Sequence, residues 1–259
     1  MPSFHDFYRA NRGGGLFSEA VSQRLGALVA MYAARWNLRP TTLTLTNLVI
    51  GLAVAGAVIA RAPDWSPWVG VAALIGWQMA YVLDCADGQL ARVTGQGSPA
   101  GARVDILCDV ASQVALVAAL SAVASAQSGV PIWLVALFSG TWLVNIVTSV
   151  LQSGPNAASM VPSRSLPVRV VKLIRDPGAI FLAAGLVLAF APGLTAWYVV
   201  LFTVVNGGFL LASILFTARA AYRHMPTAPG TTVGKETASP AKPAAPIVRQ
   251  RRGETFATR

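Results

Sequence analysis

The chain has 259 residues, of which 54% are hydrophobic and only 12% are charged, and its formal net charge is +10. A soluble domain of this length carries about twice as large a charged fraction, so the composition argues against a soluble protein and favours one whose solvent is lipid. A strong positive charge is also typical of nucleic-acid-binding proteins. The positions of the charges along the chain decide between these two interpretations.

The N-terminal segment begins without an apolar core in residues 1–15, so it does not have the form of a signal peptide. Residues 16–35 place apolar side chains at helical spacing, with polar side chains on the other faces. This pattern predicts an amphipathic helix lying in the cytoplasmic interface of a membrane, rather than a seventh span. The apolar positions are Phe17, Val21, Leu25, Leu28 and Tyr32.

Six apolar stretches follow, each near the ~20 residues that an α-helix needs to cross about 30 Å of hydrocarbon. Helices are expected because lipid offers no hydrogen-bond partners to an open backbone. The predicted fold class is therefore all-α: a polytopic integral membrane protein with six transmembrane helices and an N-terminal interfacial amphipathic helix. The predicted spans are 43–60, 67–83, 104–126, 130–152, 178–194 and 197–217.

Nineteen of the 20 basic residues fall on one side of this arrangement, and Arg61 alone falls on the other. The positive-inside rule then places both termini in the cytoplasm of a multi-pass protein of the cell membrane. The net charge becomes a topology signal, to which anionic lipid headgroups add, and no nucleic-acid partner is expected.

The chain is expected to have three parts. Residues 1–40 form a cytoplasmic N-terminal segment that carries the amphipathic helix, and residues 41–220 form the six-helix membrane domain. Residues 221–259 are rich in Pro, Ala, Thr, Lys and Arg, which predicts a disordered basic cytoplasmic tail.

Four carboxylates gather in residues 84–109, DCADGQLARVTGQGSPAGARVDILCD. Asp84 and Asp87 are three residues apart and Asp105 and Asp109 are four apart, so each pair shares one face of a helix. The connection between the two helices is short and rich in glycine. We therefore expect antiparallel neighbouring helices whose carboxylates converge at the cytoplasmic boundary.

Four anionic groups at membrane depth are costly and repel one another, and divalent cations relieve both problems. Hard oxygen ligands suit Mg²⁺ or Mn²⁺, and two ions bridged by carboxylates suit phosphoryl chemistry. The alternative is that the aspartates cap helices and form ion pairs with Arg92 and Arg103, two cations for four carboxylates. Cys85 and Cys108 have no zinc-binding partners at the required spacing, and we interpret them as small buried side chains without a disulfide.

The spacing of this stretch resembles the signature of the CDP-alcohol phosphotransferase family, and the resemblance covers roughly residues 16–220. It implies transfer of a phospho-alcohol group, in particular phosphatidyl, from a CDP-linked donor such as CDP-diacylglycerol to an alcohol hydroxyl. CMP is released, and the reaction belongs to phospholipid biosynthesis. The matching pattern is Asp84-x2-Asp87-Gly88-x2-Ala91-Arg92-x8-Gly101-x3-Asp105-x3-Asp109.

The same resemblance implies roles for the carboxylates. Asp84, Asp87 and Asp105 hold two Mg²⁺ or Mn²⁺ ions that bind the donor's diphosphate. Asp109 ligates the second ion and acts as general base on the acceptor hydroxyl.

Donor contacts are implied as well. Gly88 lets the nucleotide approach the helix, Arg92 pairs with a donor phosphate, and Ser98 lies near it. The inner end of the first span is expected to contact the cytidine nucleotide, although capping of that helix explains its threonines equally well. These residues are Pro40, Thr41, Thr42 and Thr44.

The acceptor stays open. Bacterial phosphatidylinositol-phosphate synthases of this family carry a Lys-x-Arg pair near the end of span four, whereas residues 148–159 of this chain, TSVLQSGPNAAS, contain no basic residue. Basic residues of the next connection can supply phosphate contacts instead, or they can simply be positive-inside charges. They are Arg164, Arg169, Lys172 and Arg175.

Other functions agree with parts of the sequence. Residues 97–101, GSPAG, slightly resemble the branch of aminoalcohol phosphotransferases that joins a small CDP-alcohol donor to a diacylglycerol acceptor. A membrane transporter also carries intramembrane aspartates, but near the midplane on broken helices. A prenyl-diphosphate enzyme uses aspartate clusters at another spacing. The expected partners are the CDP-linked donor, the alcohol acceptor and membrane lipids, and a homodimer is left open.

Overall fold

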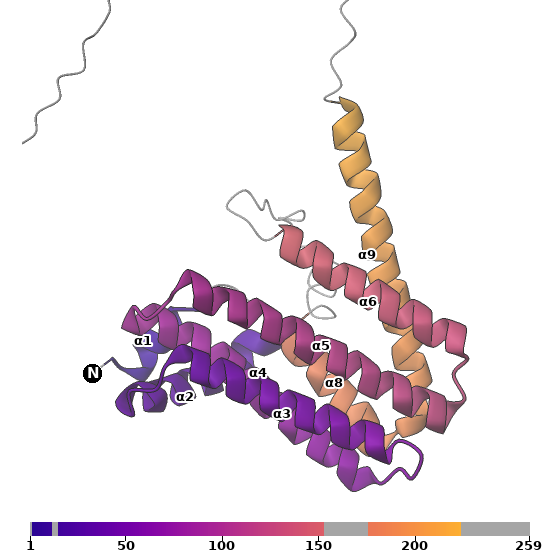
Figure 1. Ribbon diagram of the computed structural model, residues 1–259, viewed down its shortest axis with the longest axis horizontal. Helices are drawn as coiled ribbons and strands as arrows, with labels where there is room; N and C mark the ends of the chain where they lie inside the picture. Colours follow the sequence, from indigo (N-terminus) through magenta and orange to yellow (C-terminus); the bar gives the residue numbers. More distant parts are fainter. Residues whose placement is uncertain (1, 12–14, 153–175, 224–259) are drawn as a thin grey trace, which may run out of the picture. The chain divides into compact units, whose positions relative to one another are not determined.

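The computed structural model describes residues 2–11, 15–152 and 176–223, apart from the side chains of 149–152 and 220–223. The described residues lie in helices or in short connections between them and include no strand, which confirms the all-helical fold class for this part of the chain (Figure 1). The chain divides into two units, Met1–Thr217 and Ala218–Arg259, and the first contains every described helix up to residue 217. The tail after residue 223 lies outside the described residues, and the predicted domain boundaries stay predictions.

The N-terminal segment contains α1 (Phe4–Arg9), which the sequence interpretation did not include, and a continuous helical stretch of a π-helical turn (Ser18–Ser22) followed by α2 (Gln23–Arg35). Small side chains of this stretch face the protein: a Cβ added to Gly26 would lie 2.9 Å from Cβ of Cys85 on the helix beneath. Most of the predicted apolar face points away from the protein. Val21, Leu25, Leu28 and Tyr32 are 40–48% exposed. This arrangement is what a helix between protein and lipid needs, while its contact with a membrane stays a prediction.

Three long helices form the centre of the first unit: α3 (Pro40–Arg61), α4 (Pro67–Thr94) and α5 (Pro99–Ser128). Each has proline in its first turn, where a missing N–H costs nothing. Gly95 and Gly129 end α4 and α5 in the left-handed conformation, with φ of 69° and 61°. Both α4 and α5 pack on α3, so the end of α4 and the start of α5 meet the start of α3 at one end of the unit.

The remaining helices are α6 (Ile132–Gln152), α8 (Pro177–Phe190), a short 3₁₀ turn (Pro192–Leu194) and α9 (Thr195–Arg223). Glycines let α8 approach α4 closely, because a Cβ on Gly70 would collide with the backbone of Leu188 and a Cβ on Gly185 with Leu74. At the far end of the unit, Gln127 of α5 donates a hydrogen bond of 2.8 Å to the carbonyl of Ala62. These contacts hold the helix ends opposite the aspartates together.

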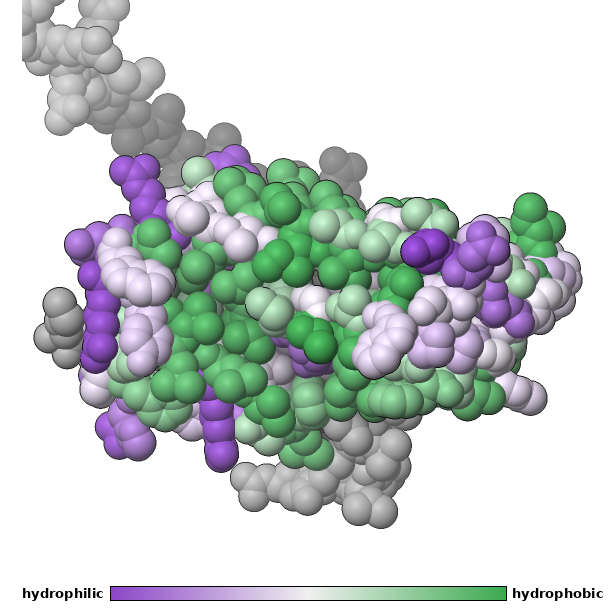
Figure 2. Space-filling model, turned by 90° about the horizontal axis from the view of Figure 1, so that it is seen from below, coloured by the Kyte–Doolittle hydropathy of each residue, from purple (hydrophilic) through white to green (hydrophobic). Residues whose placement is uncertain are grey.

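Apolar side chains cover most of the surface shown in Figure 2, and hydrophilic ones gather toward the ends. Four described helical stretches are long and apolar enough to cross a membrane: Pro40–Arg61, Pro67–Thr94, Pro99–Ser128 and Pro192–Arg219. Ile132–Thr148 and Pro177–Phe190 are apolar but shorter. With 14 residues, α8 is about 21 Å long, less than the hydrocarbon thickness, because the chain turns at Pro192 and Gly193. The chain thus has the helices of an integral membrane protein, and the count of six spans stays a prediction.

Candidate active site

Three of the four predicted aspartates converge. Asp84 comes from α4, Asp105 and Asp109 come from α5, and one carboxylate oxygen of each lies within 4.8 Å of the others. The i, i+4 spacing of Asp105 and Asp109 puts both on the side of α5 that faces α4. The carboxylates from the two helices converge as expected, although within the described residues α4 and α5 pack mainly on α3 and not on each other.

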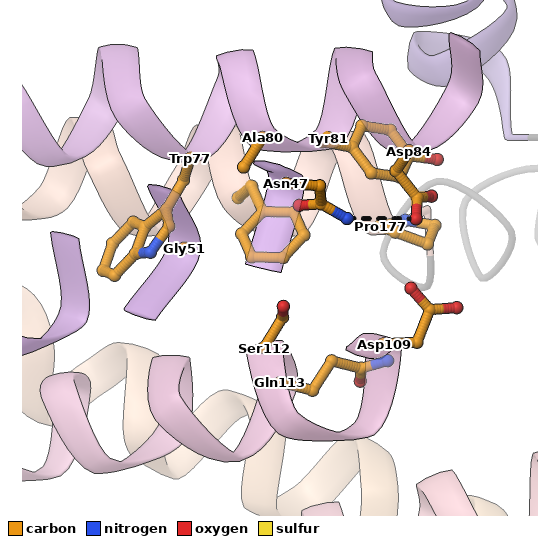
Figure 3. Close-up of a pocket in the computed structure, with 11 residues that line it drawn as sticks. Asn47, Gly51, Trp77, Ala80, Tyr81, Asp84, Asp109, Ser112, Gln113 and Pro177 are labelled. Carbon is orange, nitrogen blue, oxygen red and sulfur yellow. Dashed lines mark hydrogen bonds between the residues drawn. The ribbon is translucent and has the colours of Figure 1, made fainter. Parts of the chain in front are cut away.

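Asp87, the fourth aspartate, is held by the neighbouring helix. Its carboxylate accepts a hydrogen bond of 2.5 Å from the hydroxyl of Thr44 on α3, and its side chain is only 5% exposed. Asp84 also has a partner on α3, because the amide of Asn47 donates to it at 3.3 Å (Figure 3). One face of α3 thus orients both carboxylates of α4.

Asp105 differs, because its Oδ1 atom is buried and has no hydrogen-bond partner within the described part of the chain. A buried carboxylate oxygen without a donor is costly. A divalent cation satisfies such an atom, and its hard oxygen ligands are the groups gathered at this point. Asp84, Asp105 and Asp109 would hold such an ion, because their carboxylate oxygens lie within 4.8 Å of one another.

All the predicted donor contacts except Thr42 line one pocket of about 180 Å³ beside these carboxylates. Thr42 is not part of the pocket wall, since its side chain is exposed in the first turn of α3. None of the threonines caps α3, whose N-cap residue is Arg39. The pocket brings together Pro40, Thr41, Thr44, Gly88, Arg92 and Ser98 with Asp87 and Asp105.

Gly88 and Arg92 depend on each other. A Cβ on Gly88 would lie 3.0 and 3.1 Å from the two terminal nitrogens of Arg92, so the guanidinium group occupies the space that the glycine leaves open. The Nε atom of Arg92 donates to the backbone carbonyl of Ala10 at 2.7 Å. The N-terminal segment therefore helps to hold the positively charged side chain of Arg92 in its place in the pocket.

Ser98 has a structural task in addition to its place in the pocket. It is the N-cap residue of α5, and its hydroxyl accepts a hydrogen bond of 3.0 Å from the backbone N–H of Gly101. A Cβ on Gly101 would lie 3.1 Å from that oxygen. The hydroxyl hydrogen of Ser98 stays available for a ligand in the pocket.

Sequence reasoning missed several residues near the aspartates. Asn47, Tyr81, Ser112 and Gln113 line a second pocket with Asp84 and Asp109, and Asn11 and Gln23 line a third with Asp84, Asp87 and Asp105. A signal existed for two of them: Asn47 follows the predicted contact Thr44 by three residues in an apolar helix, and Ser112 follows Asp109 at the same interval. The N-terminal contacts had no such signal. The four basic residues proposed for the acceptor, 164–175, lie outside the described residues.

A family model described as CDP-alcohol phosphatidyltransferase matches residues 37–205, more than half of the chain. The match includes α3, α4, α5 and all four aspartates. The chain belongs to the CDP-alcohol phosphatidyltransferase family. Its aspartate cluster, the adjacent pocket and the apolar helices are therefore parts of a membrane transferase of CDP-linked phospho groups.

The family match begins after α2 and ends within α9, so α1 and α2 lie outside it. No curated protein matches the chain significantly. The acceptor of this family member must consequently be argued from its own residues.

Proposed function

We propose that this protein transfers a phosphatidyl group from CDP-diacylglycerol to an alcohol hydroxyl, with two divalent cations and with release of CMP. The observation that carries the proposal is the meeting of Asp84, Asp105 and Asp109 at the edge of a pocket that contains Arg92. Anionic groups alone repel a diphosphate. Carboxylates beside a fixed guanidinium are instead suited to a diphosphate that arrives with its cations.

In this proposal Asp84, Asp87, Asp105 and Asp109 hold the ions, whose chemical contribution is to neutralise the diphosphate and the leaving phosphate. Arg92, whose guanidinium lies over Gly88, binds a donor phosphate oxygen, and the nucleotide lies in the pocket beside this part of α4. Thr44 and Asn47 orient Asp87 and Asp84 by their hydrogen bonds. These positions are set before the donor arrives, which reduces the reorganisation needed for reaction.

The reaction forms one bond and breaks one. The acceptor oxygen bonds to the phosphorus that carries diacylglycerol, and the bond from that phosphorus to the bridging oxygen of the diphosphate breaks. CMP leaves with the electron pair on its phosphate, and the hydroxyl proton passes to the carboxylate of Asp109. Atoms and charge balance without a further reactant.

The site is proposed to face the cytoplasm, where CMP and polar acceptors are dissolved, while the diacyl donor enters from the lipid. With 28 residues, α4 is about 42 Å long, longer than the hydrocarbon layer, so its C-terminal turns can reach the headgroup region. Both termini belong on the same side by the distribution of basic residues. A transporter site near the bilayer midplane fits this placement less well.

Purified protein in detergent with CDP-diacylglycerol and a mixture of alcohol acceptors tests the proposal through the release of CMP. We expect release that requires Mg²⁺ or Mn²⁺, stops with EDTA, and falls by a factor of at least about 10² in Asp109→Asn, the usual scale for loss of a general base. Binding of the donor should persist in that variant, because the other three carboxylates remain. Turnover of Asp109→Asn near the wild-type rate would refute the assignment of the base.

If the acceptor carries a phosphate, that dianion needs cations, and the basic residues between α6 and α8 are the proposed source. Alanine substitution of Arg169 or Lys172 should then raise the KM for the acceptor far more than the KM for the donor. Equal small effects on both substrates mean that these residues only determine topology.

A further inference from the structure

A small chamber of about 70 Å³ opens from the carboxylates of Asp84 and Asp109 into the space between α3, α4, α5 and α8 (Figure 3). In that view Ser112 points from α5 toward α4, into the space beside Asp109. Gly51 of α3 contributes no side chain, so the chamber stays open on that side. Its other walls include Asn47, Trp77, Tyr81, Gln113 and Phe181.

The chamber has neutral polar groups and no Lys, Arg or His among its described lining residues. The hydroxyl oxygen of Ser112 is buried and has no hydrogen-bond partner in the described part of the chain. The amide of Gln113 is fixed, because its Oε1 accepts from the indole N–H of Trp142 at 3.2 Å and an indole can only donate. Its NH₂ group then remains as a donor toward a ligand.

This chamber and the donor pocket lie on different sides of the carboxylate cluster, and among the residues that the structure describes they share no lining residue. Arg92, Asp87 and Asp105 border the donor pocket, whereas Asp84 and Asp109 border the chamber. A diphosphate needs the side with the cation. Because Asp109 borders the chamber, a hydroxyl bound there would lie beside the carboxylate that takes its proton.

The volume limits what can enter. An apolar cavity of about 150 Å³ is known to hold a benzene molecule, and the chamber is about half that size. A six-membered polyol ring does not fit inside it, whereas a short chain of a few heavy atoms does. The polar groups on its wall favour a chain that carries a hydroxyl of its own.

We propose that this chamber binds the reacting end of the acceptor, and that this end is a short, linear, uncharged arm with hydroxyl groups, as in a glycerol unit, rather than a ring. Ser112 and Gln113 bind the hydroxyl next to the reacting one and so determine specificity. The inference rests on the proposed function for the role of Asp109. A soluble glycerol derivative presents such an arm, whereas a 1,2-diacylglycerol does not, because the oxygen next to its free hydroxyl is esterified.

Matched acceptors distinguish an arm from a ring. For CMP release from CDP-diacylglycerol, the kcat/KM with sn-glycerol 3-phosphate should be at least about tenfold higher than that with myo-inositol 3-phosphate. The kcat/KM with glycerol should exceed that with myo-inositol by a similar factor. CMP release from CDP-choline with 1,2-diacylglycerol, in place of release with the glycerol acceptors, would also overturn the proposal, because the oxygen next to the reacting hydroxyl is then an ester. A ring acceptor that matches or exceeds its linear counterpart overturns the proposal.

Variants of the wall provide a second measurement. In Gly51→Ala the new Cβ would lie 3.5 Å from the hydroxyl oxygen of Ser112, an ordinary contact, so the fold is kept while the chamber narrows. The KM for the best linear acceptor should rise at least about tenfold in Gly51→Ala and in Gln113→Leu, with the KM for the donor unchanged. Gly56→Ala, on the same helix with no atom within 4 Å of the new Cβ, is the control. Equal acceptor KM values in Gly51→Ala and Gly56→Ala contradict the assignment.

A labelling experiment separates failure of the chamber from failure of the proposed function, because it needs no turnover. Ser112→Cys is introduced with Cys85→Ala and Cys108→Ala, and the new thiol is treated with methyl methanethiosulfonate in the presence of sn-glycerol 3-phosphate or glycerol. We expect either linear compound to slow labelling severalfold more than its ring counterpart. Protection without CMP release under any condition means that the chamber binds the arm and the proposed transferase reaction is wrong. Absence of protection by both linear compounds overturns the chamber itself.

Discussion

At the scale of single residues, the four aspartates acquire different tasks from their neighbours. Thr44 and Asn47 on α3 bind Asp87 and Asp84, whereas the buried oxygen of Asp105 has no donor among the described residues. Their spacing in the sequence was enough to predict that carboxylates from two helices converge. It was not enough to predict the partners, because these come from a third helix some 40 residues earlier in the chain.

At position 88, the sequence and the structure give different reasons for the presence of a glycine. The resemblance implied close approach of a nucleotide, and the structure adds that the guanidinium of Arg92 lies where a Cβ would be. Gly88→Ala should keep or slightly raise the melting temperature, since alanine is favoured over glycine within helices by up to about 1 kcal/mol. It should raise the KM for CDP-diacylglycerol about tenfold, because displacement of the guanidinium loses about 1.4 kcal/mol of a charge-assisted contact.

Gly56→Ala is the matched control for this measurement, since its new Cβ meets no atom within 4 Å. A donor KM that is equal in Gly88→Ala and in this control shows that the position of Arg92 does not affect donor binding. A large fall in melting temperature would instead point to a packing role for Gly88.

At the scale of elements, the N-terminal segment is fastened to α8 by a buried carboxylate. Asp176 is 1% exposed, and its two oxygens accept hydrogen bonds from the N–H and hydroxyl of Ser18 and from the N–H of Gly178. The hydroxyl of Ser18 also lies 2.8 Å from that of Tyr81 on α4. Three elements far apart in the sequence thus meet at one side chain.

Asp176→Asn should destabilise this junction, because an amide accepts on one side only and its NH₂ group then faces another donor. The cost of an unsatisfied buried hydrogen bond is about 1–3 kcal/mol. For a protein of this size that lowers the melting temperature by roughly 2–4 °C per kcal/mol, which a thermal unfolding assay in detergent measures. Asp64→Asn, an exposed aspartate in the connection between α3 and α4, is the control. Identical melting temperatures of the two variants would contradict a stabilising role for Asp176.

The sequence predicted the bounds of some helices better than those of others. Long apolar runs gave α3, α4 and α5 with starts close to the prolines that begin them. The length of α8 could not be predicted in the same way, since its apolar run passes through Pro192 and Gly193, where the helix ends. The side of α2 that faces the protein was also hidden, because small residues such as Gly26 and Ala30 pack there while larger apolar side chains point outward.

At the scale of the first unit, the helix ends near the aspartates carry most of the described basic residues, and Arg61 lies at the opposite end. Cysteines introduced as Ser3→Cys and Asp64→Cys, both at exposed positions, test this polarity in a variant without Cys85 and Cys108. In intact cells a membrane-impermeant maleimide should label the second and not the first. Labelling of both positions from outside would reverse or remove the predicted topology.

The central claim is that the four aspartates hold two divalent ions for phosphoryl transfer, and a direct test is Mn²⁺ binding followed by electron paramagnetic resonance. Detergent-solubilised protein with CDP-diacylglycerol is titrated with Mn²⁺, beside a variant in which all four aspartates are changed to asparagine. The account predicts two bound ions per chain, close enough to be magnetically coupled, and none at this site in the variant. Equal binding by the wild-type protein and the variant would contradict it.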